Sequence, residues 1–109
     1  MKQTVTIAIG RNVGSQPIGD LTWSGFCSAI RNDLFRLQRD YVNVKVTLIS
    51  ETAGFDYTGE PCAVFVATVD GGRREPRAAL SALRAHLALR ALHYQQDAIA
   101  LTVGQTTFV

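Results

Sequence analysis

The sequence predicts one α+β domain, residues 1–109, in which four strands and two helices follow one another in the order βαββαβ. Four short stretches have the alternating or continuous apolar character of strands. Two longer stretches repeat apolar residues at the three- and four-residue spacing of a helix. A chain of 109 residues with 47% hydrophobic composition is also long enough to bury a core without disulfides or a metal.

The first strand and the first helix are separated by a loop that is rich in glycine. Residues 3–9 alternate apolar with smaller or polar side chains, which is the period of a strand. After the loop at 10–19, Asp20 is a good N-cap for a helix over residues 21–39. The apolar residues on one stripe of this helix are Trp23, Phe26, Cys27, Ile30, Leu34 and Leu37.

The second and third strands are predicted to form a hairpin. Residues 43–50 are predicted to form the second strand and residues 62–69 the third. The third strand is apolar on both faces, which indicates a central place in the sheet. The segment 51–61 between them is expected to be a hairpin loop that carries Phe55 and Tyr57.

The second helix and the last strand complete the pattern. Pro76 suits the first turn of a helix that runs to about Leu92, and residues 98–103 form the last strand. This order resembles the ferredoxin-like plait, an antiparallel four-stranded sheet ordered fourth, first, third, second, with both helices on one face. In that topology the segments 10–19, 51–61 and 93–97 share one end of the sheet. Residues 70–76 and both termini share the other.

Composition and charge exclude several classes of function. A net charge of +2 does not indicate a strongly basic nucleic-acid binder, and the chain has neither a membrane-spanning stretch nor a signal-peptide pattern. We therefore expect a cytoplasmic protein, in the host cytoplasm if it is viral. Cys27 and Cys62 are interpreted as small core residues. His86 and His93 lie about two helical turns apart, or roughly 10 Å, which is too far for them to share a metal. No metal or cofactor is expected.

A binding rim is predicted where three segments meet at one end of the sheet. The loop at 10–19 leads into a helix, and free backbone N–H groups at a helix start favour an anion. Arg11 would add a charged contact, although the loop is equally explained as a simple turn, and Phe55 and Tyr57 as residues folded back onto the sheet. The predicted ligand-binding residues are Arg11, Asn12, Phe55, Asp56, Tyr57, His93 and Tyr94.

The second helix is apolar nearly all round. Such a helix needs a second packing partner besides the sheet, which predicts a homo-oligomer, although alanine is also common in helices for its propensity alone. The predicted interface residues are Ala82, Ala85, Leu89 and Leu92. The cluster Arg73, Arg74 and Arg77 lies at the opposite end of the sheet from Arg11, where it meets phosphate, an acidic protein surface or only solvent.

An enzyme is the alternative to a binding protein. Acylphosphatases are similar in plan, with an arginine in the first strand-to-helix loop and an asparagine on the second strand, roles that Arg11 and Asn43 would take. The chain departs from that family because it lacks the run glycine-valine-glycine-phenylalanine-arginine and has a longer loop. A cofactor-free dimeric barrel enzyme with His93 as acid or base is the other catalytic alternative.

Two segments, IGRNVGSQPIGDLTWSGF and QDAIALTVGQTTFV, resemble short uncharacterised α+β proteins of tailed phages. That resemblance implies an inhibitor of host defence that binds a host protein or sequesters a nucleotide signal, or a minor virion protein. It assigns no catalytic residue. We therefore expect a small non-catalytic binding protein for an anionic, nucleotide-like ligand or a host protein. A small plait enzyme and a virion component are the alternatives.

Overall fold

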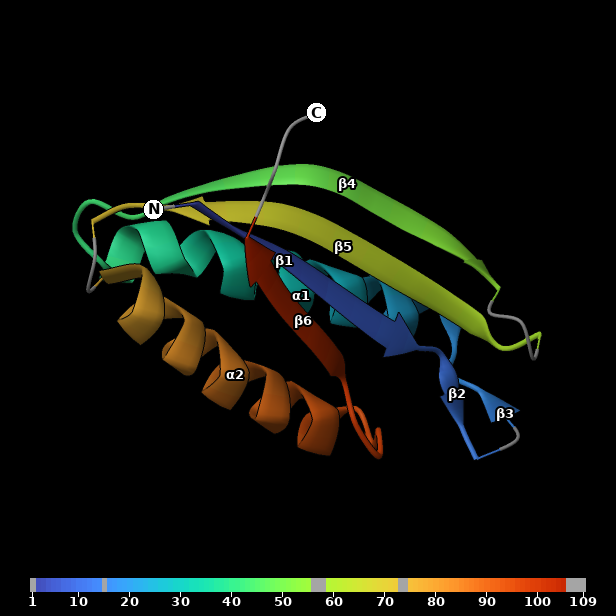
Figure 1. Ribbon diagram of the computed structural model, residues 1–109. Coiled ribbons are helices and arrows are strands. Elements are labelled where there is room, and N and C mark those ends of the chain that lie inside the picture. Colours follow the sequence, from blue (N-terminus) through green and yellow to red (C-terminus); the bar gives the residue numbers. More distant parts are fainter. Residues whose placement is uncertain (1, 15, 56–58, 73–74, 106–109) are drawn as a thin grey trace.

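The computed structural model describes residues 2–14, 16–55, 59–72 and 75–105. They form a four-stranded antiparallel sheet, and two helices cover one of its faces (Figure 1). This arrangement is the predicted ferredoxin-like plait. The main elements are β1 (Lys2–Gly10), α1 (Asp20–Asp40), β4 (Lys45–Phe55), β5 (Pro61–Asp70), α2 (Glu75–His93) and β6 (Ala100–Gln105).

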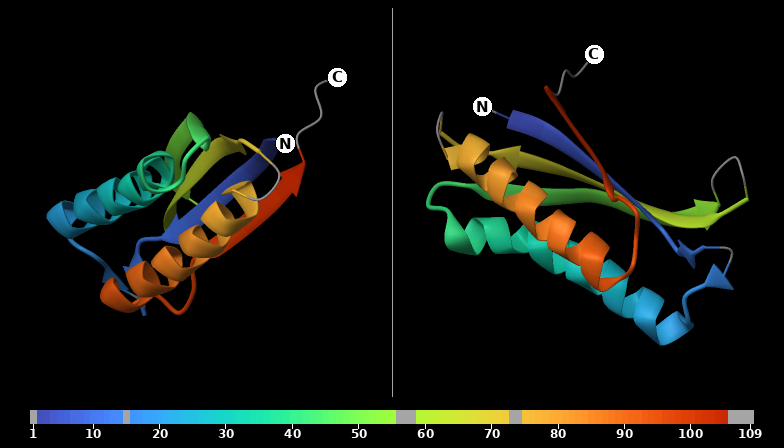
Figure 2. Two further views of the ribbon diagram at one scale, coloured as in Figure 1. Left: turned by 90° about the vertical axis from the view of Figure 1, so that its left-hand side faces the viewer. Right: turned by 90° about the horizontal axis from the view of Figure 1, so that it is seen from below.

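The sheet order is β4-β5-β1-β6, so the first strand in sequence lies inside the sheet and the last strand lies at an edge. All three strand pairs are antiparallel; β1 is paired with β5 from Lys2↔Asp70 to Gly10↔Cys62, and with β6 from Gln3↔Gln105 to Ala8↔Ala100. The predicted order of fourth, first, third and second strand is therefore confirmed. Figure 2 shows the ends of β1 and β6 close together at one end of the sheet.

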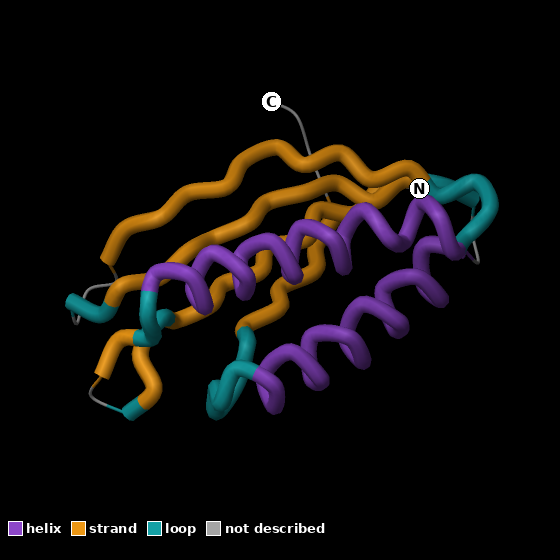
Figure 3. The backbone as a smooth tube through the Cα atoms, turned by 180° about the vertical axis from the view of Figure 1, so that it is seen from behind, coloured by secondary structure: helices purple, strands orange, loops and turns teal. Residues whose placement is uncertain are grey.

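The core lies between the sheet and the two helices, which form one layer below the strands (Figure 3). In β1 the alternation places Val5, Ile7 and Ile9 on the helix side, where each is at most 1% exposed. Fully burying such a side chain stabilises the fold by about 1.5–3 kcal/mol. The helices supply the facing apolar residues, which are Phe26, Ile30, Leu34, Leu37, Ala79, Leu83 and Leu87.

Helix α1 begins one residue earlier than predicted, and its N-cap is different. Gly19 holds the N-cap position with an extended backbone, and no side chain caps the helix there. Asp20 is the first helical residue, and its carboxylate pairs with Arg11. The prediction of Asp20 as N-cap is therefore wrong, because an arginine in the preceding loop takes the carboxylate.

The β4–β5 hairpin is longer than predicted. We expected a loop over 51–61, but β4 continues to Phe55 and β5 begins at Pro61. A β-bulge between Leu48 and Ser50 shifts the register, and the pairing then runs on to Phe55↔Pro61. Cross-strand pairing thus overrides the weak strand propensity of the small and polar residues in this segment.

The start of β4 and the bounds of β6 also differ from the prediction. Asn43 has a φ of 67° and lies in the turn after α1, so the strand begins at Lys45 rather than at residue 43. Gln95, with a φ of 56°, follows the end of α2. Strand β6 occupies Ala100–Gln105 rather than 98–103, because its register with β1 starts at Ala8↔Ala100.

Candidate functional site at the rim of the sheet

The loop after β1, the β4–β5 hairpin and the segment after α2 lie at the same end of the sheet, as the topology predicts (Figure 1). The loop itself contains a small hairpin of β2 (Asn12–Val13) and β3 (Gln16–Pro17). Gly14 has a φ of 63°, a conformation that favours glycine. The glycine-rich loop is therefore first of all a structural turn.

The Arg11 side chain is tied to its own loop and to the start of α1. Its Nε donates to the Ile18 carbonyl at 2.9 Å, and its guanidinium pairs with the Asp20 carboxylate. The guanidinium carbon also lies 5.8 Å from the centre of the Trp23 ring, within the range of a cation–π contact. Arg11 therefore has three partners within the chain, and its predicted contact with a ligand stays a prediction.

A hollow of about 760 Å³ opens at this rim, between the ends of β1 and β5, the β2 loop and the segment after α2. A volume of this order accommodates a small organic molecule. Two of the predicted ligand-binding residues, Asn12 and Phe55, line the hollow. Phe55 is 74% exposed and so offers an aromatic surface to a ligand.

The described polar residues around the hollow are amides and carboxylates. The predicted Asn12 is joined by residues that sequence reasoning missed, which are Glu60, Gln95, Gln96 and Asp97, together with the thiol of Cys62. The described lining contains two carboxylates and no lysine or arginine. The rim as described therefore offers hydrogen-bond groups and negative charge rather than a cradle for an anion.

Asn12 and Gln96 connect the β2 loop to the segment after α2. The Gln96 Nε2 donates to the Asn12 carbonyl at 3.4 Å and to the Tyr94 carbonyl at 3.3 Å, two long hydrogen bonds. The Asn12 Oδ1 is buried and accepts no hydrogen bond from the described residues. A buried acceptor without a donor costs free energy, so this atom is a point of local instability in the loop.

Tyr94 and His93 do not line the hollow. The Tyr94 ring stacks on Phe26, with centroids 4.3 Å apart and an interplanar angle of 10°, so it extends the core. His93 is exposed and touches Tyr94 edge-on. Asp56 and Tyr57, the remaining predicted rim residues, lie outside the described residues.

The residues suggested for acylphosphatase-like chemistry are far apart in the fold. Arg11 lies at the rim, whereas Asn43 lies in the α1–β4 turn at the opposite end (Figure 1). The pair therefore does not assemble into one site.

The two cysteines occupy different environments. Cys27 is half-buried against the core, and burial raises the pKa of its thiol, with a further upward contribution from the nearby Glu51 carboxylate. Cys62 is half-buried beside the rim hollow, and both thiols are free. Within the described part of the chain, no three histidine, cysteine or acidic residues gather as metal ligands would.

The second helix exposes the residues predicted for an interface. Leu89 is 63% exposed and Leu92 is 78% exposed, while Ala85 is exposed and Ala82 half-buried. Arg77 lies near the start of α2, at the end of the sheet opposite the rim, as expected. Arg73 and Arg74 lie outside the described residues.

Comparison by sequence finds no match among family models and none among curated proteins. Solved structures of similar fold do exist. An amidase of the hydantoinase/carbamoylase family from Burkholderia vietnamiensis matches with a TM-score of 0.69 at 13% identity, over 99% of this chain and 27% of that one. An aminopeptidase from Bacillus cereus matches with a TM-score of 0.64 at 11% identity, over 94% of this chain and 28% of that one.

A phage SAM lyase in complex with S-methyl-5'-thioadenosine is similar over most of both chains. It has a TM-score of 0.52 at 13% identity and is matched over 95% of this chain and 81% of its own length. The present chain spans little more than a quarter of the amidase and peptidase chains. At these identities the likeness shows the fold. None of the described helices is long and apolar enough to cross a membrane.

Proposed function

We propose that this protein is a small non-catalytic binding protein whose ligand enters the rim hollow. The observation that carries the proposal is the 760 Å³ hollow itself, with amides and carboxylates around it and an exposed phenylalanine at its edge. A concave site with a few convergent polar groups is the usual form of a small-molecule site.

The lining favours a nucleoside over an anionic nucleotide. The described lining of the hollow holds no lysine or arginine that would bind phosphate, and the guanidinium of Arg11 is already held by its loop. An exposed side-chain amide such as that of Gln95 matches the donor and acceptor pattern of an adenine edge, carboxylates accept from ribose hydroxyls, and an aromatic ring stacks on a base. The proposal therefore replaces the anion expected from sequence with a neutral or cationic ligand.

The phage SAM lyase gives this proposal independent support. Its structure holds S-methyl-5'-thioadenosine, a nucleoside without a phosphate, on a similar fold of comparable length. This neighbour also agrees with the hypothesis that the present chain is a phage protein that sequesters such a molecule, or blocks a host protein, in the host cytoplasm.

Calorimetric titration with adenosine, S-methyl-5'-thioadenosine and adenosine monophosphate tests the ligand class. We expect saturable binding of a nucleoside, with the monophosphate weaker by about tenfold or more because the described lining offers Asp97 but no cation to the phosphate. Phe55→Ala should weaken nucleoside binding by about tenfold, since stacking on an aromatic ring is worth about 1–3 kcal/mol. Thr52→Ala, an exposed change in the same strand outside the hollow, is the matched control.

Two results would contradict the proposed ligand class. Binding of neither nucleoside would show that the hollow does not take this class, and tighter binding of the monophosphate would restore the anionic ligand. Incubation with S-adenosylmethionine followed by chromatography tests the enzymatic alternative. Any turnover would replace the non-catalytic assignment.

The proposal includes a homo-oligomer through the outer face of α2. Leu89 and Leu92 lie exposed there with the small residues Ala82 and Ala85. Exposed leucines that gather on one helix face are typical of a protein interface.

A further inference from the structure

The two edges of the sheet differ in how they are protected against an added strand. At the β4 edge a bulge interrupts the register, Lys45 is charged, and Glu51 pairs with Arg31 of α1 at 2.8 Å. Bulges and charges are the features that prevent edge-to-edge pairing. The β6 edge, Ala100–Gln105, has no charged residue and no proline, and its pairing with β1 contains no register shift.

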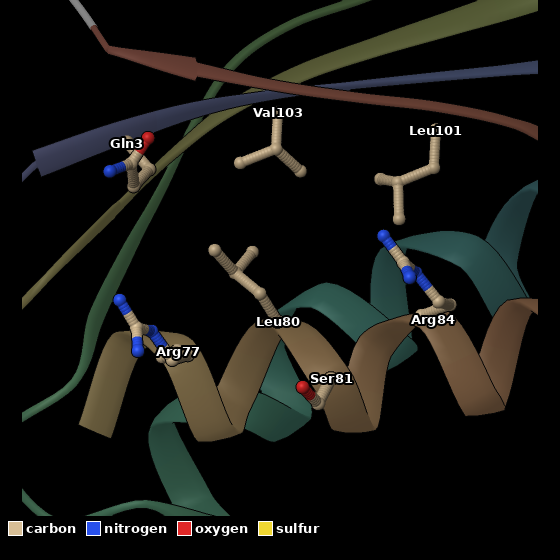
Figure 4. A pocket seen from close by; sticks show the side chains of 7 residues that line it. All are labelled: Gln3, Arg77, Leu80, Ser81, Arg84, Leu101 and Val103. Atoms are coloured by element: carbon tan, nitrogen blue, oxygen red, sulfur yellow. The ribbon is translucent and has the colours of Figure 1, made fainter. Parts of the chain in front are cut away.

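An open groove runs beside the β6 edge, between this strand and α2. It consists of two hollows of about 310 and 420 Å³ that share Arg84 and Leu101. Figure 4 shows Arg77, Leu80 and Arg84 rising from α2 toward β6, from which Leu101 and Val103 point back. Because Leu101 and Val103 are two positions apart on one face of the strand, the hollows suit alternate side chains of a neighbouring strand.

The groove carries positive charge on its helix side. Neither Arg77 nor Arg84 has an acidic partner among the described residues, and both are exposed. Asp97 lines the second hollow but not the first. The end of the groove beside Leu80 and Val103 is therefore the basic end.

We propose that β6 and this groove bind an extended, acidic segment of a partner protein, which adds to the sheet as a fifth strand. The backbone of β6 would supply main-chain hydrogen bonds. The groove would take apolar side chains over Leu80, Leu101 and Val103, and the two arginines would pair with acidic residues of the segment. The second hollow shares Asp97 and Ala98 with the rim hollow, whereas the first hollow, at the basic end, shares no residue with it. The inference does not depend on the proposed ligand.

Charge argues against a second copy of this chain as the occupant. Two-fold pairing of β6 with itself would bring the Arg77 and Arg84 side chains of both copies to one seam, where like charges are destabilising. An acidic strand has the opposite and complementary charge.

The test uses nuclear magnetic resonance of the labelled protein with a capped hexapeptide in which glutamate and valine alternate. We expect saturable shifts of the amides of Thr102 and Gly104. The same peptide with lysine in place of glutamate, and a version N-methylated on every second residue, should bind at least tenfold more weakly. The first control removes the charge match and the second removes the main-chain donors.

Variants of the protein complete the test. Arg77→Glu with Arg84→Glu should weaken the acidic peptide at least tenfold and favour the lysine peptide, while Arg36→Glu on α1, outside the groove, should leave binding unchanged. The spectrum of each variant reports that it is folded. Three results would overturn the inference: no saturable shift at millimolar peptide, equal binding of the N-methylated peptide, or self-association of the wild type through β6.

Discussion

At the scale of single residues, Arg11 has a different role from the one its position in sequence indicates. It follows the first strand directly, in a loop that leads to a helix, so both solvent and an anionic ligand were reasonable partners. In the structure its partners are the Ile18 carbonyl, the Asp20 carboxylate and the face of Trp23. The side chain closes the loop against the helix start, so we expect it to stabilise the fold.

Arg11→Ala should therefore lower the free energy of unfolding by about 1–2 kcal/mol, through loss of a charged hydrogen bond and a cation–π contact. The pair with Asp20 contributes little of this, since that carboxylate is 95% exposed. Urea titration measures the change. Arg31→Ala, which removes a surface pair with Glu51, is the control and should cost about 0.5 kcal/mol or less. Equal stability of wild type and Arg11→Ala would contradict this role.

Gly71 marks a close approach of two backbone segments. A Cβ at this position would lie 2.6 Å from the Asn43 carbonyl oxygen, a backbone atom that cannot rotate away. Gly71→Ala should therefore destabilise the protein by about 1–3 kcal/mol, the usual cost of overpacking. Gly104→Ala is the matched control, because nothing lies within 4 Å of its added Cβ. Thermal or urea unfolding of the two variants separates the effects, and similar stabilities would disprove the close approach.

At the scale of elements, an ion pair fastens the two helices to each other. Asp33 of α1 is 1% exposed and accepts two hydrogen bonds from Arg90 of α2, at 2.9 and 3.1 Å. These bonds raise the pKa of Arg90 above its ordinary value. The pair fixes how the helices lie beside one another, whereas apolar contacts alone would allow sliding.

Arg90→Ala should cost about 3–5 kcal/mol, because it leaves the buried Asp33 carboxylate without its partner. Arg84→Ala, an exposed change on the same helix, should stay within about 0.5 kcal/mol. Chemical denaturation of both variants tests the difference. Arg90→Lys restores the positive charge and should recover part of the lost stability. If it recovers none, the loss does not come from leaving the Asp33 carboxylate unpaired.

The elements themselves were largely predictable from sequence, and the exceptions have physical reasons. Helix α1 was evident because its apolar residues recur at helical spacing, yet the same pattern concealed Asp33, whose burial depends on an arginine 57 residues away. The sequence of the outer half of β4 indicates a loop, because small and polar residues fill it. Its strand structure comes from pairing with β5, which is a tertiary interaction.

At the scale of the whole molecule, the topology allowed the location of the rim to be predicted but not its chemistry. The three segments that meet there were identified from the order of elements, and Asn12 and Phe55 were found in this way. Glu60, Gln96 and Asp97 were missed because polar residues in turns follow no period. The sequence predicts Tyr94 at the rim, but in the structure its ring stacks on Phe26 and packs against the core.

The oligomer is the prediction that belongs to this scale. Leu89→Glu with Leu92→Glu should give a folded monomer, since both side chains are exposed and their loss leaves the core intact. Sedimentation velocity at tens of micromolar compares the variant with the wild type, and circular dichroism confirms the fold. A wild type that sediments as a monomer under these conditions would remove the oligomer from the proposal. Lys2→Glu, an exposed change far from this face, is the control.

The pairing of Gln3 with Gln105 brings the first and last strands of the described chain together at the end of the sheet opposite the rim. A domain whose two ends lie close together can be inserted into a longer polypeptide through two short linkers without disturbing its core. The topology therefore places both points of attachment to such a polypeptide at one end of the sheet. The rim hollow lies at the opposite end of the sheet, away from these points.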